Sequence, residues 1–232
     1  GFRQIANRKS KIANMNDGIL IIDKPETWTS HDVVGKLRRL LKTKRIGHTG
    51  TLDPFATGVL VMLVGQATRL AQFLDKDQKE YVATVQFGFE TDTGDRTGGT
   101  RDEGRGMKDE EISDILNKTN WDNVFEDFRG EILQTPPMYS AKKVDGKKLY
   151  ELARKGVEIE RKPVAVKIYE LELLGPIHNP QSAIRIRVVC SAGTYIRTLA
   201  KDIGRKIGVP CHLSALRRTR AGKFDLSKAV TI

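Results

Sequence analysis

The stretch 45–63, RIGHTGTLDPFATGVLVML, constrains the fold most, because a loop of defined shape runs directly into an apolar segment. Pro54 fixes its own φ angle and biases Asp53 toward an extended conformation. Three glycines permit backbone angles that other residues resist: Gly47, Gly50 and Gly58. Asp53 is therefore expected on a shaped loop, where chemistry often lies. Taken alone, the Asp-Pro dipeptide is more typical of an ordinary turn that caps the next element.

Composition favours a folded basic protein with a polyanionic partner. The 232 residues carry 40 Lys and Arg against 29 Asp and Glu, a formal net charge of +11, and 39% are hydrophobic, enough for a core. Cys190 and Cys211 show no zinc or disulfide pattern, and the four histidines have no metal-ligand spacing. We expect no metal and no cofactor. The absence of a long apolar run and of a signal peptide predicts no membrane segment. The two cysteines without a disulfide pattern predict a reduced, cytoplasmic setting.

The chain divides into a short tail and one domain. Residues 1–14 are polar and basic without a period, so we expect a flexible basic N-terminal tail. Residues 15–232 are expected to form a single domain. No internal repeat is evident.

Hydrophobic periodicity predicts short strands and helices in mixed order. Strands are expected at residues 18–23, 58–64, 79–89, 129–133, 164–174, 183–190 and 212–224. Helices are expected after a cap at Thr29 or Ser30, and at residues 67–73, 107–118, 148–155 and 195–207. The order lacks a regular βαβ alternation, which predicts an α+β fold with a mixed, mainly antiparallel sheet flanked by helices and loops.

Two patterns indicate which face of an element is buried and which is exposed. The first helix should bury one stripe, made of Val33, Val34, Leu37, Leu40 and Leu41. The strand at 183–190 alternates apolar residues with Arg185 and Arg187, so its polar face is expected to be basic.

Once the common catalytic motifs are excluded, the remaining candidate is a carboxylate that acts beside a fixed cation. The sequence has no GxxxxGK[ST] phosphate loop, no HExxH and no GxSxG. A buried Asp53 would need a fixed cation to stay ionised. Arg197 is the best candidate because it follows a Gly-Thr helix start, although a surface arginine is the simpler interpretation. Tyr81 and Tyr195 could hold an extruded base, although Tyr81 also fits core packing.

The motif GHTGTLDPFATGVL resembles the catalytic signature of the TruB family of tRNA pseudouridine synthases. Four further regions resemble the family in the same order: GILIIDKP with TSHDVV, KEYVATVQFGFETDTGD, TPPMYSAKKVDGKKLYELARKG, and CSAGTYIRTLAKDIG followed by LRRTRAG. The resemblance spans about residues 18–224 and implies the pseudouridine synthase fold.

The resemblance also implies roles. Asp53 matches the aspartate that attacks the target nucleotide, at the ribose or at the base. Tyr81 matches the tyrosine that stacks on the flipped base, and Arg197 the arginine that pairs with the carboxylate. The other matches are a second pocket tyrosine (Tyr195), a T-loop contact (His48), an apolar pocket residue (Leu216), and structural support for the loop (Lys24 and Pro25).

The implied activity is isomerisation of uridine 55 in the T stem-loop of tRNA to pseudouridine, without cofactor or metal, by a monomer. Two alternatives are a catalytically silent tRNA-binding or RNA-folding module on the same fold and a generic basic RNA-binding protein without a pocket. The family's usual C-terminal PUA domain is expected to be absent from this chain, which ends at Ile232. Thr27 stands where the family usually has Gly, so we expect a different turn there, and Phe55 replaces the usual Leu.

Overall fold

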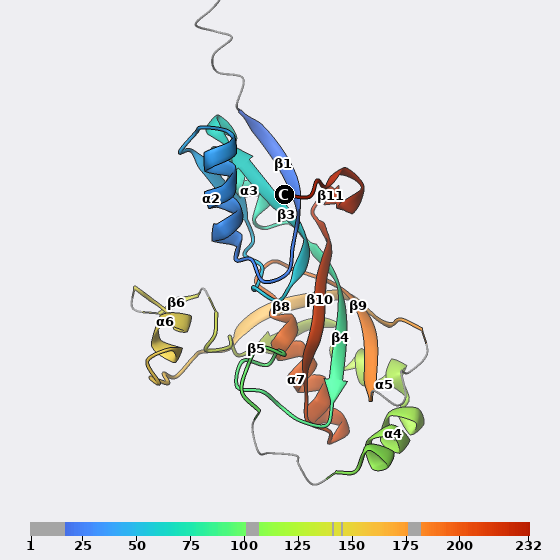
Figure 1. Ribbon diagram of the computed structural model, residues 1–232. Helices are drawn as coiled ribbons and strands as arrows, with labels where there is room; N and C mark the ends of the chain where they lie inside the picture. Colours follow the sequence, from blue (N-terminus) through green and yellow to red (C-terminus); the bar gives the residue numbers. More distant parts are fainter. Residues whose placement is uncertain (1–16, 101–106, 141, 145, 176–181) are drawn as a thin grey trace, which may run out of the picture.

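A large twisted sheet runs through the molecule (Figure 1). The computed structural model describes residues 17–100, 107–140, 142–144, 146–175 and 182–232, so the tail expected at 1–14 lies outside the described residues. The nine-stranded sheet has the order β1-β3-β10-β4-β9-β8-β5, with β2 added beside β3 and β11 beside β10. All its pairs are antiparallel except the parallel contact of β3 with β10. The expected α+β class with a mainly antiparallel sheet is confirmed.

The N-terminal part forms one end of the sheet. Its elements are β1 (Gly18–Lys24), α2 (Ser30–Leu40), β2 (Ile46–Thr49), β3 (Thr57–Val64), the 3-10 helix η1 (Gly65–Leu70) and α3 (Ala71–Leu74). Thr29 caps α2 through a reciprocal capping box with Asp32, as the cap residues predicted. Seven of the eight residues of β3 are buried, which identifies it as a central strand.

The remaining elements complete the nine-stranded sheet, flank it, and add a separate two-stranded sheet of β6 with β7. They are β4 (Lys79–Phe87), α4 (Asp109–Lys118), α5 (Trp121–Glu126), β5 (Gly130–Gln134), β6 (Lys143–Val144), β7 (Lys147–Lys148), α6 (Leu149–Ala153), β8 (Val164–Leu173), β9 (Ala183–Cys190), α7 (Ile196–Ile207), β10 (Cys211–Ala221), β11 (Phe224–Asp225) and η2 (Leu226–Lys228). Helix α7 packs against β10 and β4. The expected antiparallel pair of β8 and β9 is confirmed.

The close approach of β3 to β10 requires a glycine. Gly58 faces Arg218 in the parallel register, with φ +99°. A Cβ at Gly58 would lie 2.2 Å from the backbone oxygen of Arg218. The glycine that shapes the loop in sequence therefore also allows the two halves of the sheet to meet.

Sequence patterns missed some local features. Strand β2 and helix α5 were not expected, and the helix expected at 67–73 is a 3-10 helix followed by the short α3. The prediction that Leu40 belongs to the buried stripe is wrong: its exposure is 59%, and it is the last residue of α2. Val33, Val34 and Leu37 are buried as expected, and Leu41 is partly buried against the same core.

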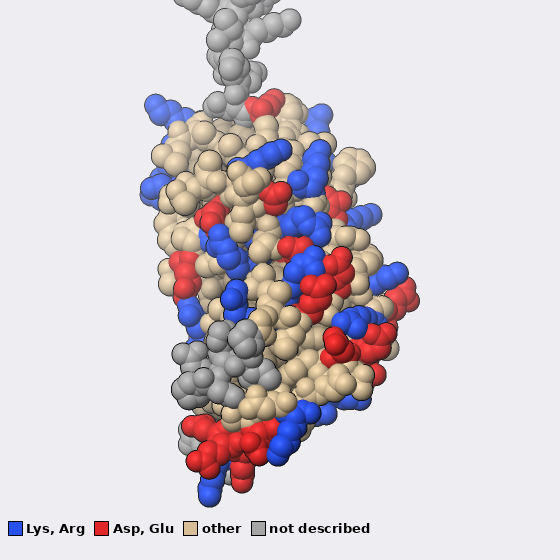
Figure 2. All heavy atoms as spheres, turned by 90° about the vertical axis from the view of Figure 1, so that its right-hand side faces the viewer, with Lys and Arg blue, Asp and Glu red and all other residues tan. Residues whose placement is uncertain are grey.

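The charged residues are mostly interspersed. On the face seen in Figure 2, Lys and Arg side chains alternate with Asp and Glu, and acidic side chains gather at its lower end. The polar face of β9 is not simply basic, because Arg187 pairs with Glu80, Glu170 and Glu172 from the strands on either side. None of the helices described is long and apolar enough to cross a membrane.

Candidate active site

The loop that carries Asp53 is fixed on both sides by the N-terminal segment. The backbone N–H of Leu52 donates to the Ser30 hydroxyl over 3.0 Å. The carbonyl of Pro54 accepts from the backbone N–H of Thr27 at 2.9 Å and from the Lys24 ammonium at 3.2 Å. Asp53 is therefore held between two anchored neighbours.

The buried Lys24 ammonium joins the N-terminal segment to the Asp53 loop. Its Nζ also donates to the carbonyls of Pro25 at 2.9 Å and Trp28 at 2.6 Å, and its side chain is inaccessible to solvent. Burial lowers the pKa of Lys24 to about 8, and the nearby Asp53 carboxylate opposes this shift. These contacts match the supporting position expected for Lys24 and Pro25.

Arg197 reaches Asp53 from the first turn of α7. Its Nε lies 2.9 Å from Oδ2 of Asp53, and its Nη2 donates to Oδ1 at 3.1 Å, which makes a two-point ion pair. The other hydrogen bonds go to the carbonyls of Thr93 and Tyr139, both at 2.8 Å. Only 5% of the Arg197 side chain is exposed, so the alternative of a surface arginine is wrong.

A second carboxylate, missed by sequence reasoning, lies behind Arg197. Asp95 is buried, and its Oδ2 is 3.7 Å from the Arg197 Nε. Its Oδ1 accepts from the Thr93 hydroxyl and from the hydroxyl and backbone N–H of Thr97. The run TDTGDRT carries the short polar residues of such a turn, but nothing in it shows that the turn packs under α7.

Two opposing effects act on Asp53. Burial raises the pKa of Asp53, and the Arg197 guanidinium opposes this rise, while Asp95 adds to it. A third of the Asp53 side chain remains exposed. This exposed part faces a cavity, so the carboxylate can meet a ligand without leaving Arg197.

The cavity has a volume of about 390 Å3. Its walls combine polar groups with aromatic and aliphatic ones, and they include every pocket residue predicted from the sequence: Asp53, Tyr81, Tyr195, Arg197, His48 and Leu216. A mixed pocket with convergent polar groups is typical of a site for a small organic group.

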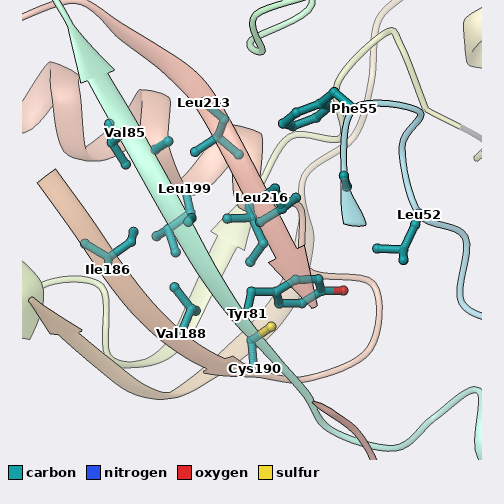
Figure 3. Close-up of a cluster of buried hydrophobic side chains, with 14 of the residues drawn as sticks. Leu52, Phe55, Tyr81, Val85, Ile186, Val188, Cys190, Leu199, Leu213 and Leu216 are labelled. Carbon is teal, nitrogen blue, oxygen red and sulfur yellow. The ribbon is translucent and has the colours of Figure 1, made fainter. Parts of the chain in front are cut away.

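Tyr81 projects from β4 between the core and the cavity. Its exposure is 9%, and Figure 3 shows its ring near Cys190 and Leu216, with the hydroxyl directed away from Leu199 and Ile186. Burial raises the pKa of Tyr81. The ring therefore belongs to the core, as expected, and also lines the pocket, whereas its contact with an extruded base stays a prediction.

Tyr195 is fixed through its backbone at the start of α7. Its N–H donates to Oε1 of the buried Gln134 at 2.9 Å, and its carbonyl accepts from Nε2 at 3.3 Å. Burial raises the pKa of the Tyr195 hydroxyl. Gln134 therefore sets the position of the helix start that carries both Tyr195 and Arg197.

His48 lies on β2 at another wall of the cavity. Its ring meets that of His31 edge to face, with centroids 5.9 Å apart. Burial, and then the proximity of His31, lowers the pKa of His48, which favours the neutral ring. No group of His, Cys, Asp and Glu side chains within the described ranges could hold a metal ion.

Comparison with known proteins assigns the family. The model of the TruB family pseudouridylate synthase N-terminal domain matches residues 38–196, and that of the tRNA pseudouridylate synthase B C-terminal domain matches 197–232. The chain belongs to the TruB family. It is 48% identical over 216 residues to tRNA pseudouridine synthase B of Solibacter usitatus, covering 93% of this chain and 70% of that protein. The same enzyme of Bacillus subtilis is 44% identical, with 94% and 69% covered.

Solved structures support the same assignment. The crystal structure of a Cbf5-Nop10-Gar1 complex contains a chain with a TM-score of 0.68 and 31% identity to this TruB family chain. The match covers 95% of this chain and 54% of that one, so this chain spans about half of the solved chain. An H/ACA RNP bound to a substrate RNA containing 2′-deoxyuridine gives a TM-score of 0.62.

Proposed function

We propose that this chain converts uridine 55 in the T loop of tRNA to pseudouridine, with Asp53 as the nucleophile. The observation that carries the proposal is the two-point ion pair of Asp53 with Arg197 in a cavity lined by Tyr81. Membership of the TruB family and the names of its relatives, tRNA pseudouridine synthase B, support the substrate class.

The reaction is an isomerisation whose atoms balance within one nucleotide. The Asp53 carboxylate attacks the target nucleotide, at the ribose or at the base, and the bond between N1 and C1′ breaks. The uracil turns and C5 bonds to C1′. The bond between Asp53 and the nucleotide breaks, which regenerates the carboxylate, the proton on C5 is lost, and N1 gains a proton. Asp53 must be ionised to attack, and the Arg197 guanidinium favours that form against burial.

The pocket fits a base removed from its stack. Such a base is held by ring contacts and by hydrogen bonds to its polar edge. Tyr81 and Leu216 supply an aromatic and an aliphatic wall, and Tyr195 adds a polar one. The net charge of +11 supports binding of the tRNA backbone, which would position the target loop over the pocket.

The test is tritium release from a T stem-loop RNA labelled at C5 of its uridines. The Asp53→Asn variant should bind this RNA as the wild type does and release no tritium, because an amide lacks the nucleophilic charge. Asp92→Asn, which removes an exposed carboxylate outside the cavity, is the matched control and should keep wild-type activity.

Two results would contradict the proposal. Release of tritium by Asp53→Asn at the wild-type rate would remove Asp53 as the nucleophile. RNA binding by the wild type without any release would instead favour the alternative of a tRNA-binding or RNA-folding module.

A further inference from the structure

Arg218 is a buried guanidinium that the reaction described above does not use. It lies on β10, its exposure is 1%, and it lines the same cavity as Asp53 and Tyr81. Its Nε donates to the carbonyl of Val59 at 2.7 Å and its Nη2 to the carbonyl of Gly50 at 3.0 Å. Gly50 and Val59 lie on either side of Asp53 in the sequence, so the guanidinium is bonded to both ends of the Asp53 loop.

The charge of Arg197 is balanced by the Asp53 carboxylate, whereas Arg218 has no such partner among the described residues. Among the ion pairs of the part of the chain that the structure describes, none involves Arg218. Burial lowers the pKa of both Lys24 and Lys79, and the charge of Arg218 lowers these pKa values further. A buried cation without a carboxylate partner is costly. Such a cation is better stabilised when negative charge develops beside it.

The group placed to develop that charge is the Tyr81 hydroxyl. Tyr81 and Arg218 are direct partners in the register of β4 with β10, and the guanidinium lies within hydrogen-bonding reach of the hydroxyl. The other titratable groups near this hydroxyl are Cys190 on β9 and Asp53. Burial raises the pKa of Tyr81 most, and Cys190 and Asp53 raise it further, so all three favour the neutral phenol. Arg218 is the group that favours the phenolate.

We propose that Arg218 is the positioning residue of Tyr81, which orients its hydroxyl and stabilises its phenolate so that it can accept the proton lost from C5. The inference rests on the proposed function. The Tyr81 phenolate takes the proton from C5 and becomes the phenol. That proton then passes to solvent, and N1 takes one from solvent, so no net proton is consumed. Arg218 does not need to touch the substrate.

The decisive measurement is the pH dependence of the single-turnover rate at saturating enzyme, which removes effects on RNA affinity. In Arg218→Gln the Tyr81 phenolate loses its stabilising charge. The rising limb of the profile should move to higher pH, and the rate at pH 7.5 should fall at least about tenfold. Arg218→Lys should recover part of the rate. In a Tyr81→Phe background, Arg218→Gln should cause no further loss in the chemical step.

The control is Arg217→Gln, which removes the same charge from the next residue of β10. Arg217 is bound to Asp23 at 2.7 Å and does not line the cavity. Its variant should keep the wild-type profile. An unshifted profile in Arg218→Gln, or an equal loss with and without the Tyr81 hydroxyl, would overturn the proposal and leave a structural role. Because the wild type still turns over, either result leaves the proposed function intact.

A second measurement keeps Arg218 in place, in case its variants do not fold. Tyr81→Phe removes the acceptor and leaves a buried guanidinium hydrogen unsatisfied, so its Tm should fall clearly more than that of Tyr195→Phe, a second tyrosine of the cavity. Equal Tm values for the two variants would show that Arg218 and Tyr81 are not coupled and would overturn the proposal.

Discussion

Arg197 and Asp53, 144 residues apart, form an ion pair with two contacts of 2.9 Å and 3.1 Å. The same guanidinium donates to the carbonyls of Thr93 and Tyr139. One side chain therefore joins helix α7 to three separate loops. Arg197 therefore fixes the geometry of the pocket and also supplies the positive charge beside Asp53.

Arg197→Lys should lower the rate at pH 7 by roughly 100-fold, because an ammonium cannot make two fixed contacts with the carboxylate. Burial raises the pKa of Asp53 and Arg197 opposes this, so weakening the pair raises that pKa further. Activity needs the ionised form and is lost as pH falls through this pKa. The loss should therefore begin at a higher pH in the variant.

The measurement is the single-turnover rate from acidic to neutral pH, with Arg205→Lys as the control on the exposed face of α7. An acid limb that coincides with that of the wild type would show that Arg197 does not hold Asp53 ionised.

The parts of the site that sequence predicted are those set by local rules. The glycines and Pro54 indicated a shaped loop, and the electrostatic need of a buried Asp53 indicated a cation. The family resemblance then pointed to the same Arg197. The strands with clear alternation, such as β4, β8 and β9, were also found from their period of two.

The parts that sequence did not predict depend on long-range packing. Asp95 and Arg218 carry no local mark of burial, and each is buried only because distant segments close over it. The sequence pattern placed Arg187 on a basic face, but in the structure it pairs with three glutamates from the strands beside β9. Tertiary neighbours, rather than period, decide whether a charge is free or paired.

Thr27→Gly should stabilise the protein by about 0.5–1 kcal/mol. Thr27 has φ +70°, in the left-handed region that a β-branched residue resists, while its N–H is bonded to Pro54. Glycine relieves that strain but loses more backbone entropy on folding, so the gain is partial. Urea unfolding measures it, and Thr27→Ala, which keeps a Cβ, should gain less. A glycine variant less stable than the wild type would refute the prediction.

Gly58→Ala should destabilise the fold by roughly 2–4 kcal/mol, since a Cβ cannot fit against the Arg218 backbone and φ is +99°. Gly18→Ala is the matched control, because a Cβ there meets no atom within 4 Å, and its effect should stay within about 0.5 kcal/mol. Thermal and urea unfolding would compare the two. Similar stabilities would mean that β3 and β10 can separate without cost.

Burial lowers the pKa of Lys24 from 10.5 to about 8. Between these values the unfolded chain binds more protons at this residue than the folded chain does. The contribution of Lys24 to the free energy of unfolding should therefore rise with pH across this window, by about 3 kcal/mol in total.

Other buried groups oppose this trend, so the test must isolate Lys24. Burial raises the pKa of Cys190 to about 11 and that of Cys211 to about 12, and both thiols lower stability as pH rises above 9.0. The free energy of unfolding is measured against pH for the wild type and for Lys24→Met, and the difference cancels the thiols. The exposed Lys44→Met serves as the control and should give a flat difference. A flat difference for Lys24→Met as well would show that the ammonium beneath the Asp53 loop is not desolvated.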